Sequence, residues 1–109
     1  MRLKHIINKI LLSSFTLISI TLGQTFEISG TIKDESGKTL SNARLTLYSS
    51  KYPLVKTERT KGNGKFKFKK ITPDKYTLNI YGAGGNSATK EIDLRSKSVT
   101  KLEVTAGQD

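Results

Sequence analysis

Few side chains in this chain could carry out catalysis or bind a transition metal. The sequence contains no cysteine, and its single histidine is His5, so catalytic triads and the usual zinc ligand sets have no members in most of the chain. Close carboxylate pairs occur only at Asp34 and Glu35, in a turn, and at Glu91 and Asp93, on the outward side of a strand. Both pairs have the pattern of solvated surface. The sequence therefore predicts a protein that is not an enzyme and that holds no metal or other cofactor.

Lysines are better candidates for function, in binding. Lys65, Lys67 and Lys69 alternate with Phe66 and Phe68, which places three ammonium groups about 7 Å apart on one face of a strand. Such a row could bind an anionic polymer with an affinity that falls steeply as salt rises. The alternative is a solvated face whose lysines discourage edge-to-edge aggregation.

Three tyrosines are candidate glycan contacts, because aromatic faces stack on sugar rings. Tyr48 and Tyr81 have the outward parity of their strands, and Tyr52 lies in a short loop. Cross-strand pairing on a half-exposed sheet is the alternative interpretation. Nucleic acid is a less favoured partner, because no aromatic residues lie between the outward lysines to stack on bases.

The elements that must position these residues are short β-strands, because apolar residues recur at every second position. Seven strands separated by turn residues are expected in an all-β, antiparallel two-sheet sandwich, with a small β-barrel as the alternative. The expected strands lie at residues 26–32, 43–48, 54–60, 65–69, 76–81, 92–94 and 102–104. The same alternation predicts a core of Phe26, Ile28, Ile32, Ala43, Leu45, Leu47, Phe66, Phe68, Ile71, Tyr76, Leu78, Ile80, Ile92, Leu94, Leu102 and Val104.

The N-terminal 23 residues have the layout of a secretory signal peptide. Three basic residues precede an apolar stretch of about 14 residues, and the small residues Thr21 and Gly23 lie three before and one before a possible cleavage site that leaves Gln24 as the new N-terminus. Because about 20 apolar residues are needed to span a membrane, cleavage is favoured over an uncleaved anchor. We therefore expect a signal peptide, 1–23, and one domain, 24–109, without a membrane span after cleavage. The destination would be the periplasm, the cell surface or the medium.

The expected mature domain is strongly basic. The chain has a formal net charge of +10, and removal of the leader's three basic residues leaves sixteen basic and nine acidic residues, or +7. Such a charge favours anionic partners, or alternatively serves solubility. Because the domain has no cysteine, burial of its core must stabilise it without disulfides.

Two segments carry a family resemblance. FEISGTIKDESGKTLSNARLTLYS resembles the opening of carboxypeptidase regulatory-like domains, and TERTKGNGKFKFKKITPDKYTLNI resembles their middle, over residues Phe26 to Val104 in all. The resemblance implies a transthyretin-like (prealbumin-like), seven-stranded Greek-key β-sandwich similar to collagen-adhesin B-type repeats. Related adhesin repeats often carry a Lys–Asn isopeptide bond. Lys33 is the candidate lysine here, but it and Asn79, where the assisting acid is sought, have outward parity, so no bond is expected.

These observations predict an exported, non-enzymatic β-sandwich that acts as an interaction or structural module at the bacterial cell envelope or outside the cell. Its partner would be a protein or a glycan, or an anionic polymer. A carbohydrate-binding module that uses the three tyrosines and a polyanion-binding surface protein that uses the three lysines are the alternatives.

Overall fold

A computed structural model describes residues 23–51 and 54–108, so residues 1–22 of the expected signal peptide, and Tyr52, lie outside the described residues. No helix in the described part of the chain is long and apolar enough to cross a membrane. The described elements are seven strands and one short 3-10 turn: β1 (Phe26–Asp34), β2 (Arg44–Ser49), β3 (Lys56–Arg59), β4 (Lys65–Ile71), β5 (Lys75–Tyr81), η1 (Ala83–Gly85), β6 (Asn86–Asp93) and β7 (Val99–Gln108).

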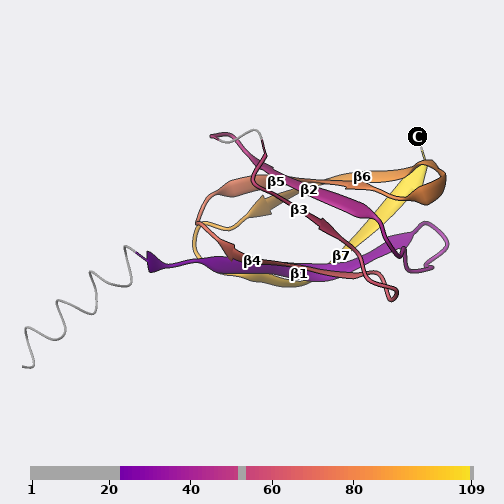
Figure 1. Cartoon of the computed structure of the whole chain (residues 1–109), viewed down its shortest axis with the longest axis horizontal. Coiled ribbons are helices and arrows are strands. Elements are labelled where there is room, and N and C mark those ends of the chain that lie inside the picture. The colour runs from indigo at the N-terminus through magenta and orange to yellow at the C-terminus, as the bar shows by residue number, and fades with distance from the viewer. Residues whose placement is uncertain (1–22, 52–53, 109) are drawn as a thin grey trace, which may run out of the picture.

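The strands form two layers that are joined along one side (Figure 1). One layer has the order β4-β1-β7 and the other the order β3-β2-β5-β6. The end of β7 also pairs with the start of β6, at Asn86 with Gln108 and Ser87 with Gly107, so the seven strands make one folded-over sheet. This arrangement confirms the all-β, seven-stranded sandwich. It leaves β3 and β4 as the two edge strands.

One pairing corrects the expectation of a fully antiparallel sandwich, because β1 and β7 run parallel. All other strand pairs are antiparallel. Strands that are joined by a tight hairpin must be antiparallel, but β1 and β7 come from the two ends of the described chain. No turn therefore fixes their relative direction, and side-chain alternation is the same for both.

The core lies between the layers and agrees closely with the alternation. Fourteen of the sixteen expected residues are buried. The other two, Phe26 and Leu102, are partly buried and pack against the same cluster. Ala106 is an additional core residue that was not predicted, because β7 continues to Gln108, beyond its expected end at residue 104. The Tyr76 ring is buried, and its hydroxyl donates to the carbonyl oxygen of Thr72 at 2.6 Å.

A β-bulge interrupts the pairing of β4 with β1. Three residues of β1, from Phe26 to Ile28, face four residues of β4, from Phe68 to Ile71. The extra residue is Lys70, whose φ of 57° lies in the left-handed region. The bulge explains why Lys69 and Lys70 are both exposed between buried neighbours.

A second bulge lies on the other side of β1, in β7. Ile28 pairs with Val99 and Gly30 pairs with Leu102, so β7 has one extra residue here, and Lys101 has a φ of 58°. The bulge brings the β7 backbone very close to Gly30. A Cβ atom on Gly30 would lie 2.0 Å from the Leu102 carbonyl oxygen, so a side chain cannot be accommodated without a shift of the backbone.

Candidate functional site

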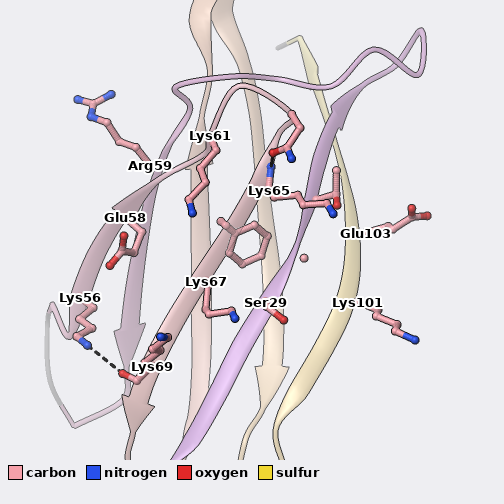
Figure 2. Close-up of a pocket in the computed structure, with 14 residues that line it drawn as sticks. Ser29, Lys56, Glu58, Arg59, Lys61, Lys65, Lys67, Lys69, Lys101 and Glu103 are labelled. Atoms are coloured by element: carbon pink, nitrogen blue, oxygen red, sulfur yellow. Dashed lines mark hydrogen bonds between the residues drawn. The ribbon is translucent and has the colours of Figure 1, made fainter.

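A groove of about 1020 Å³ extends over the outer face of the β4-β1-β7 layer and is bordered by β3 (Figure 2). Its middle is formed by β1, where the short residues Ser29, Gly30 and Thr31 are partly buried. The neighbouring strands carry long charged side chains at the matching positions. The groove therefore results from small residues on a central strand between longer residues on its two neighbours.

The groove is strongly basic. Seven cationic and two acidic side chains line it, which gives a net charge of +5. The cations are Lys56, Arg59, Lys61, Lys65, Lys67, Lys69 and Lys101, and the acids are Glu58 and Glu103.

One wall of the groove contains the three lysines that the sequence singled out. Lys65, Lys67 and Lys69 are exposed on β4, whereas the alternating Phe66 and Phe68 are buried. The two phenylalanine rings contact each other edge to face, with centroids 6.0 Å apart, which anchors β4 on the core. The structure thus brings all three predicted lysines together at one site.

The opposite wall is formed by β7 and was not predicted from the sequence. Glu103 is the register partner of Thr31, and Lys101 lies one residue before the partner of Gly30. Thr100 and Lys101 are both exposed, because the bulge breaks the alternation and turns the extra residue outward. Lysine is not a residue type that favours positive φ, so the sequence carries no signal for this bulge.

The third border of the groove is the edge strand β3, in which all four residues are exposed. Lys56 and Glu58 pair with Leu47 and Leu45, which are core residues, so these two charges occupy inward positions of an edge strand. Inward charges of this kind oppose the addition of a further strand. The Lys56 Nζ donates to the Lys69 carbonyl oxygen at 2.9 Å and links the edges of the two layers (Figure 2).

Most of the cations in the groove lack an acidic partner. Lys67 Nζ lies 4.0 Å from Glu27 Oε2, at the limit of an ion pair. Glu103 instead pairs with Lys33, which is not part of the groove, at 3.7 Å. Within residues 23–51 and 54–108, none of the other groove cations has a carboxylate within 4.0 Å. The groove therefore carries positive charge that the protein itself does not neutralise.

The predicted tyrosine contacts are not brought together. Tyr81 is 47% exposed on β5, and the Arg44 guanidinium lies over its ring, 5.4 Å from the centroid. Arg44 pairs with Tyr81, whereas Tyr48 lies four residues further along β2, about 13 Å away, and is only partly exposed. Tyr52 is outside the described residues. The two described tyrosines thus do not form one stacking platform.

The first carboxylate pair, in the turn after β1, is held in local structure. One oxygen of Asp34 accepts hydrogen bonds from the backbone N–H and hydroxyl of Ser36 and from the backbone N–H of Lys38, at 2.6–3.0 Å. These bonds lower the pKa of Asp34, with the Ser36 hydroxyl making the largest contribution. Glu35 lies beside the end of β7, where its carboxylate accepts a long hydrogen bond from the backbone N–H of Gln108.

The second pair, on β6, is also engaged in contacts along the surface. Asp93 binds the Arg95 guanidinium through both carboxylate oxygens, at 2.9 and 2.8 Å, and this contact lowers the pKa of Asp93 to about 2. Glu91 accepts a hydrogen bond from the Thr77 hydroxyl at 3.0 Å. In the part of the chain that the structure describes, no three acidic or histidine side chains are close enough to hold a metal ion.

The positions considered for an isopeptide bond belong to different layers. Lys33 lies on β1 and pairs with Glu103 on β7. Asn79 lies on β5, where its side-chain oxygen accepts a hydrogen bond from Thr89 on β6. Each side chain is exposed or partly exposed and has a partner within its own layer.

Comparisons with known proteins agree with this architecture. The family model described as carboxypeptidase regulatory-like domain matches residues 27–107. Among solved structures, the Bacillus anthracis TIE protein is 25% identical, with a TM-score of 0.64, over 77% of this chain and 17% of that one. BcpA, the major pilin subunit of Bacillus cereus, is 15% identical, with a TM-score of 0.59, over 79% of this chain and 31% of that one.

The same shape also occurs in enzymes. Catechol 1,2-dioxygenase from Pseudomonas arvilla C-1 is 12% identical, with a TM-score of 0.61, over 80% of this chain and 53% of that one. At this identity the likeness shows the fold alone, as it does for the pilin. The chain spans less than two thirds of the length of each of these structures. A search of curated proteins finds no match.

Proposed function

The chain belongs to the carboxypeptidase regulatory-like domain family, and from this we propose that it is an exported, non-enzymatic interaction or structural module of the cell envelope or the extracellular space. The observation that carries the proposal is the contrast between its two kinds of charged group. The carboxylate pairs that could serve acid–base chemistry are engaged in local contacts, whereas most of the groove lysines are unpaired. Unpaired surface charge is suited to binding.

The similar structures support a role in contacts between macromolecules. The domain has the fold of part of a Bacillus cereus pilin subunit and of part of the Bacillus anthracis TIE protein. In both, a unit of this size is one portion of a much longer chain. A small β-sandwich of this kind can act as a rigid support for a binding surface.

Export and processing can be tested directly. Expression of the full chain in bacteria, followed by fractionation and intact-mass measurement, should give a product outside the cytoplasm that begins at Gln24. A Leu12→Arg variant, which interrupts the apolar stretch of the leader, should remain cytoplasmic and uncut. Full-length wild-type protein in the cytoplasm would contradict the proposal.

Between the two alternative binding roles, the geometry favours the anionic polymer over the neutral glycan. The three predicted lysines share one groove with four further cations. The described tyrosines are separate, and the ring of Tyr81 is partly occupied by Arg44. A partner that is recognised through the lysine groove is therefore the second candidate function.

A further inference from the structure

We propose that the groove on β4, β1 and β7 binds a linear phosphodiester polymer with flexible, ring-free units, such as a polyol phosphate chain. The inference deepens the interaction role proposed above by naming the surface and the chemical class of the partner. It is based on the positions of the cations, the composition of the groove floor and the kind of side chain that carries the charge.

The cations are arranged in a way that suits an extended chain. Lys65, Lys67 and Lys69 extend over about 14 Å along β4, with a repeat of about 7 Å. On the other side of β1, Lys101 lies about 10 Å from Lys67, two strand spacings away, with Ser29 between them. The Lys101 side chain is exposed and extends away from β1 (Figure 2), so a polymer strand that follows β1 would contact the β4 lysines directly and Lys101 after a change of its rotamer.

Protection of an edge strand does not account for this arrangement. Lysines on β4 could protect the edge, because β4 pairs with β1 on one side only. In contrast, β7 is an interior strand between β1 and β6, and it needs no such protection. The extra residue of its bulge nevertheless places Lys101 on the groove wall, although left-handed backbone is unfavourable for lysine.

The floor and walls indicate what the polymer is made of. Six of the seven cations are lysines, which bind phosphate as compact point charges and lack the planar fork of arginine. Among the described residues, Phe66 is the one aromatic that lines the groove, and at 4% exposed it offers no surface for stacking on sugar rings or bases. Ser29 and Thr31 place two hydroxyl groups on the floor, and neither makes a hydrogen bond within the described residues. These features fit a ring-free chain with phosphate charges and bridging oxygens.

The test is titration of the purified protein with fluorescently labelled poly(glycerol phosphate), followed by anisotropy at several salt concentrations. If about five phosphates are neutralised, the logarithm of the affinity should fall with the logarithm of salt with a slope of about −3.5. The affinity should then decrease about 100-fold between 50 and 200 mM salt. Heparin, polyglutamate and a single-stranded oligonucleotide should each compete less well at equal charge.

The chain offers a matched pair of variants. Lys101→Gly and Lys70→Gly each remove one charge and relieve one left-handed lysine, in bulges on the two sides of β1. Lys101 lines the groove and Lys70 does not. Both variants should fold and should have a higher urea midpoint than the wild type. Lys101→Gly should weaken binding about fivefold and reduce the salt slope by about 0.7, whereas Lys70→Gly should have a much smaller effect.

Three outcomes would overturn the proposal: no binding at 50 mM salt, equal loss of affinity in the two glycine variants, or tighter binding of heparin, polyglutamate or the oligonucleotide. The first result would show that the groove is not a binding site for this polymer. The second would show that the overall charge of the protein, and not the groove, attracts the polymer. The third would show that the groove binds another class of partner. None of these results bears on export or processing, which are tested separately by fractionation and mass.

Discussion

Gly30→Ala is the substitution for which the structure predicts the largest effect relative to the size of the change. The added Cβ would lie 2.0 Å from the Leu102 carbonyl oxygen, 2.8 Å from the Leu102 carbonyl carbon and 2.9 Å from its Cβ. Because Cβ atoms are essentially never found within 3.0 Å of such neighbours, β7 must move away from β1 by at least about 1 Å. The first two atoms are backbone, so a change of rotamer cannot relieve the contact.

The cost follows from what lies around the contact. A shift of about 1 Å would lengthen the hydrogen bonds between β1 and β7 on either side of Gly30 beyond their useful range. Two lost bonds, together with backbone groups left unpaired in a partly buried sheet, correspond to about 3–5 kcal/mol. Domains of this size have a free energy of unfolding of about 5–10 kcal/mol, so the variant should be close to unfolding in water.

Urea unfolding followed by far-ultraviolet circular dichroism measures this effect. With a slope of about 1 kcal/mol per M, the midpoint should fall by about 3 M or more. Gly62→Ala is the matched control, because Gly62 has an ordinary φ and no atom within 4 Å of its added Cβ. Its midpoint should stay the same or rise slightly. A Gly30→Ala midpoint within 0.5 M of the wild type, an interval of about 0.5 kcal/mol on the same slope, would refute the close approach of β1 and β7.

Two further predictions concern single polar groups. Tyr76→Phe keeps the buried ring but removes the hydrogen bond to the Thr72 carbonyl oxygen, so the free energy of unfolding should fall by about 1–2 kcal/mol, whereas Tyr81→Phe should leave the urea midpoint unchanged. The second prediction is a pH dependence. Asp93 has a folded-state pKa of about 2, below the ordinary aspartate value of 3.8, because of its hydrogen bonds with Arg95. The contact therefore contributes stability above about pH 4 that is lost as the pH falls toward 2. Asp93→Asn should show a smaller loss of urea midpoint between pH 5 and pH 2.5, and equal losses in the two proteins would contradict this assignment.

The sequence predicts those parts of the fold that depend on side-chain alternation. The faces of β4 and β5 follow directly from the sequence, because Phe66, Phe68, Tyr76, Leu78 and Ile80 alternate with polar residues and are all buried. The family resemblance is confirmed by the family model, and the seven-stranded sandwich that it implies is confirmed by the order of the strands. Alternation indicates which side of a strand faces the core, and it can be read from each strand separately.

Properties that depend on two strands at once could not be predicted in this way. The parallel direction of β1 and β7 leaves alternation unchanged, and the bulges at Lys70 and Lys101 occur at residues that do not favour positive φ. The candidate site was accordingly predicted only in part. Its β4 wall was found because its lysines follow the alternation, whereas Lys101 and the β3 residues Lys56 and Arg59 join the groove only through tertiary structure.

The groove and the stability of the sandwich have a common origin in the contact between β1 and β7. The bulge in β7 requires a glycine at position 30, and Gly30 lines the groove together with its neighbours Ser29 and Thr31. The same bulge turns Lys101 outward onto the wall. A side chain at position 30 would meet the backbone of Leu102, the neighbour of Lys101, so it would weaken the sheet and displace the β7 wall of the groove together. Because these effects coincide, loss of binding in Gly30 variants says nothing specific about recognition. The Lys101→Gly variant should stabilise the fold while it weakens binding, so it separates an effect on the binding site from an effect on the stability of the sheet.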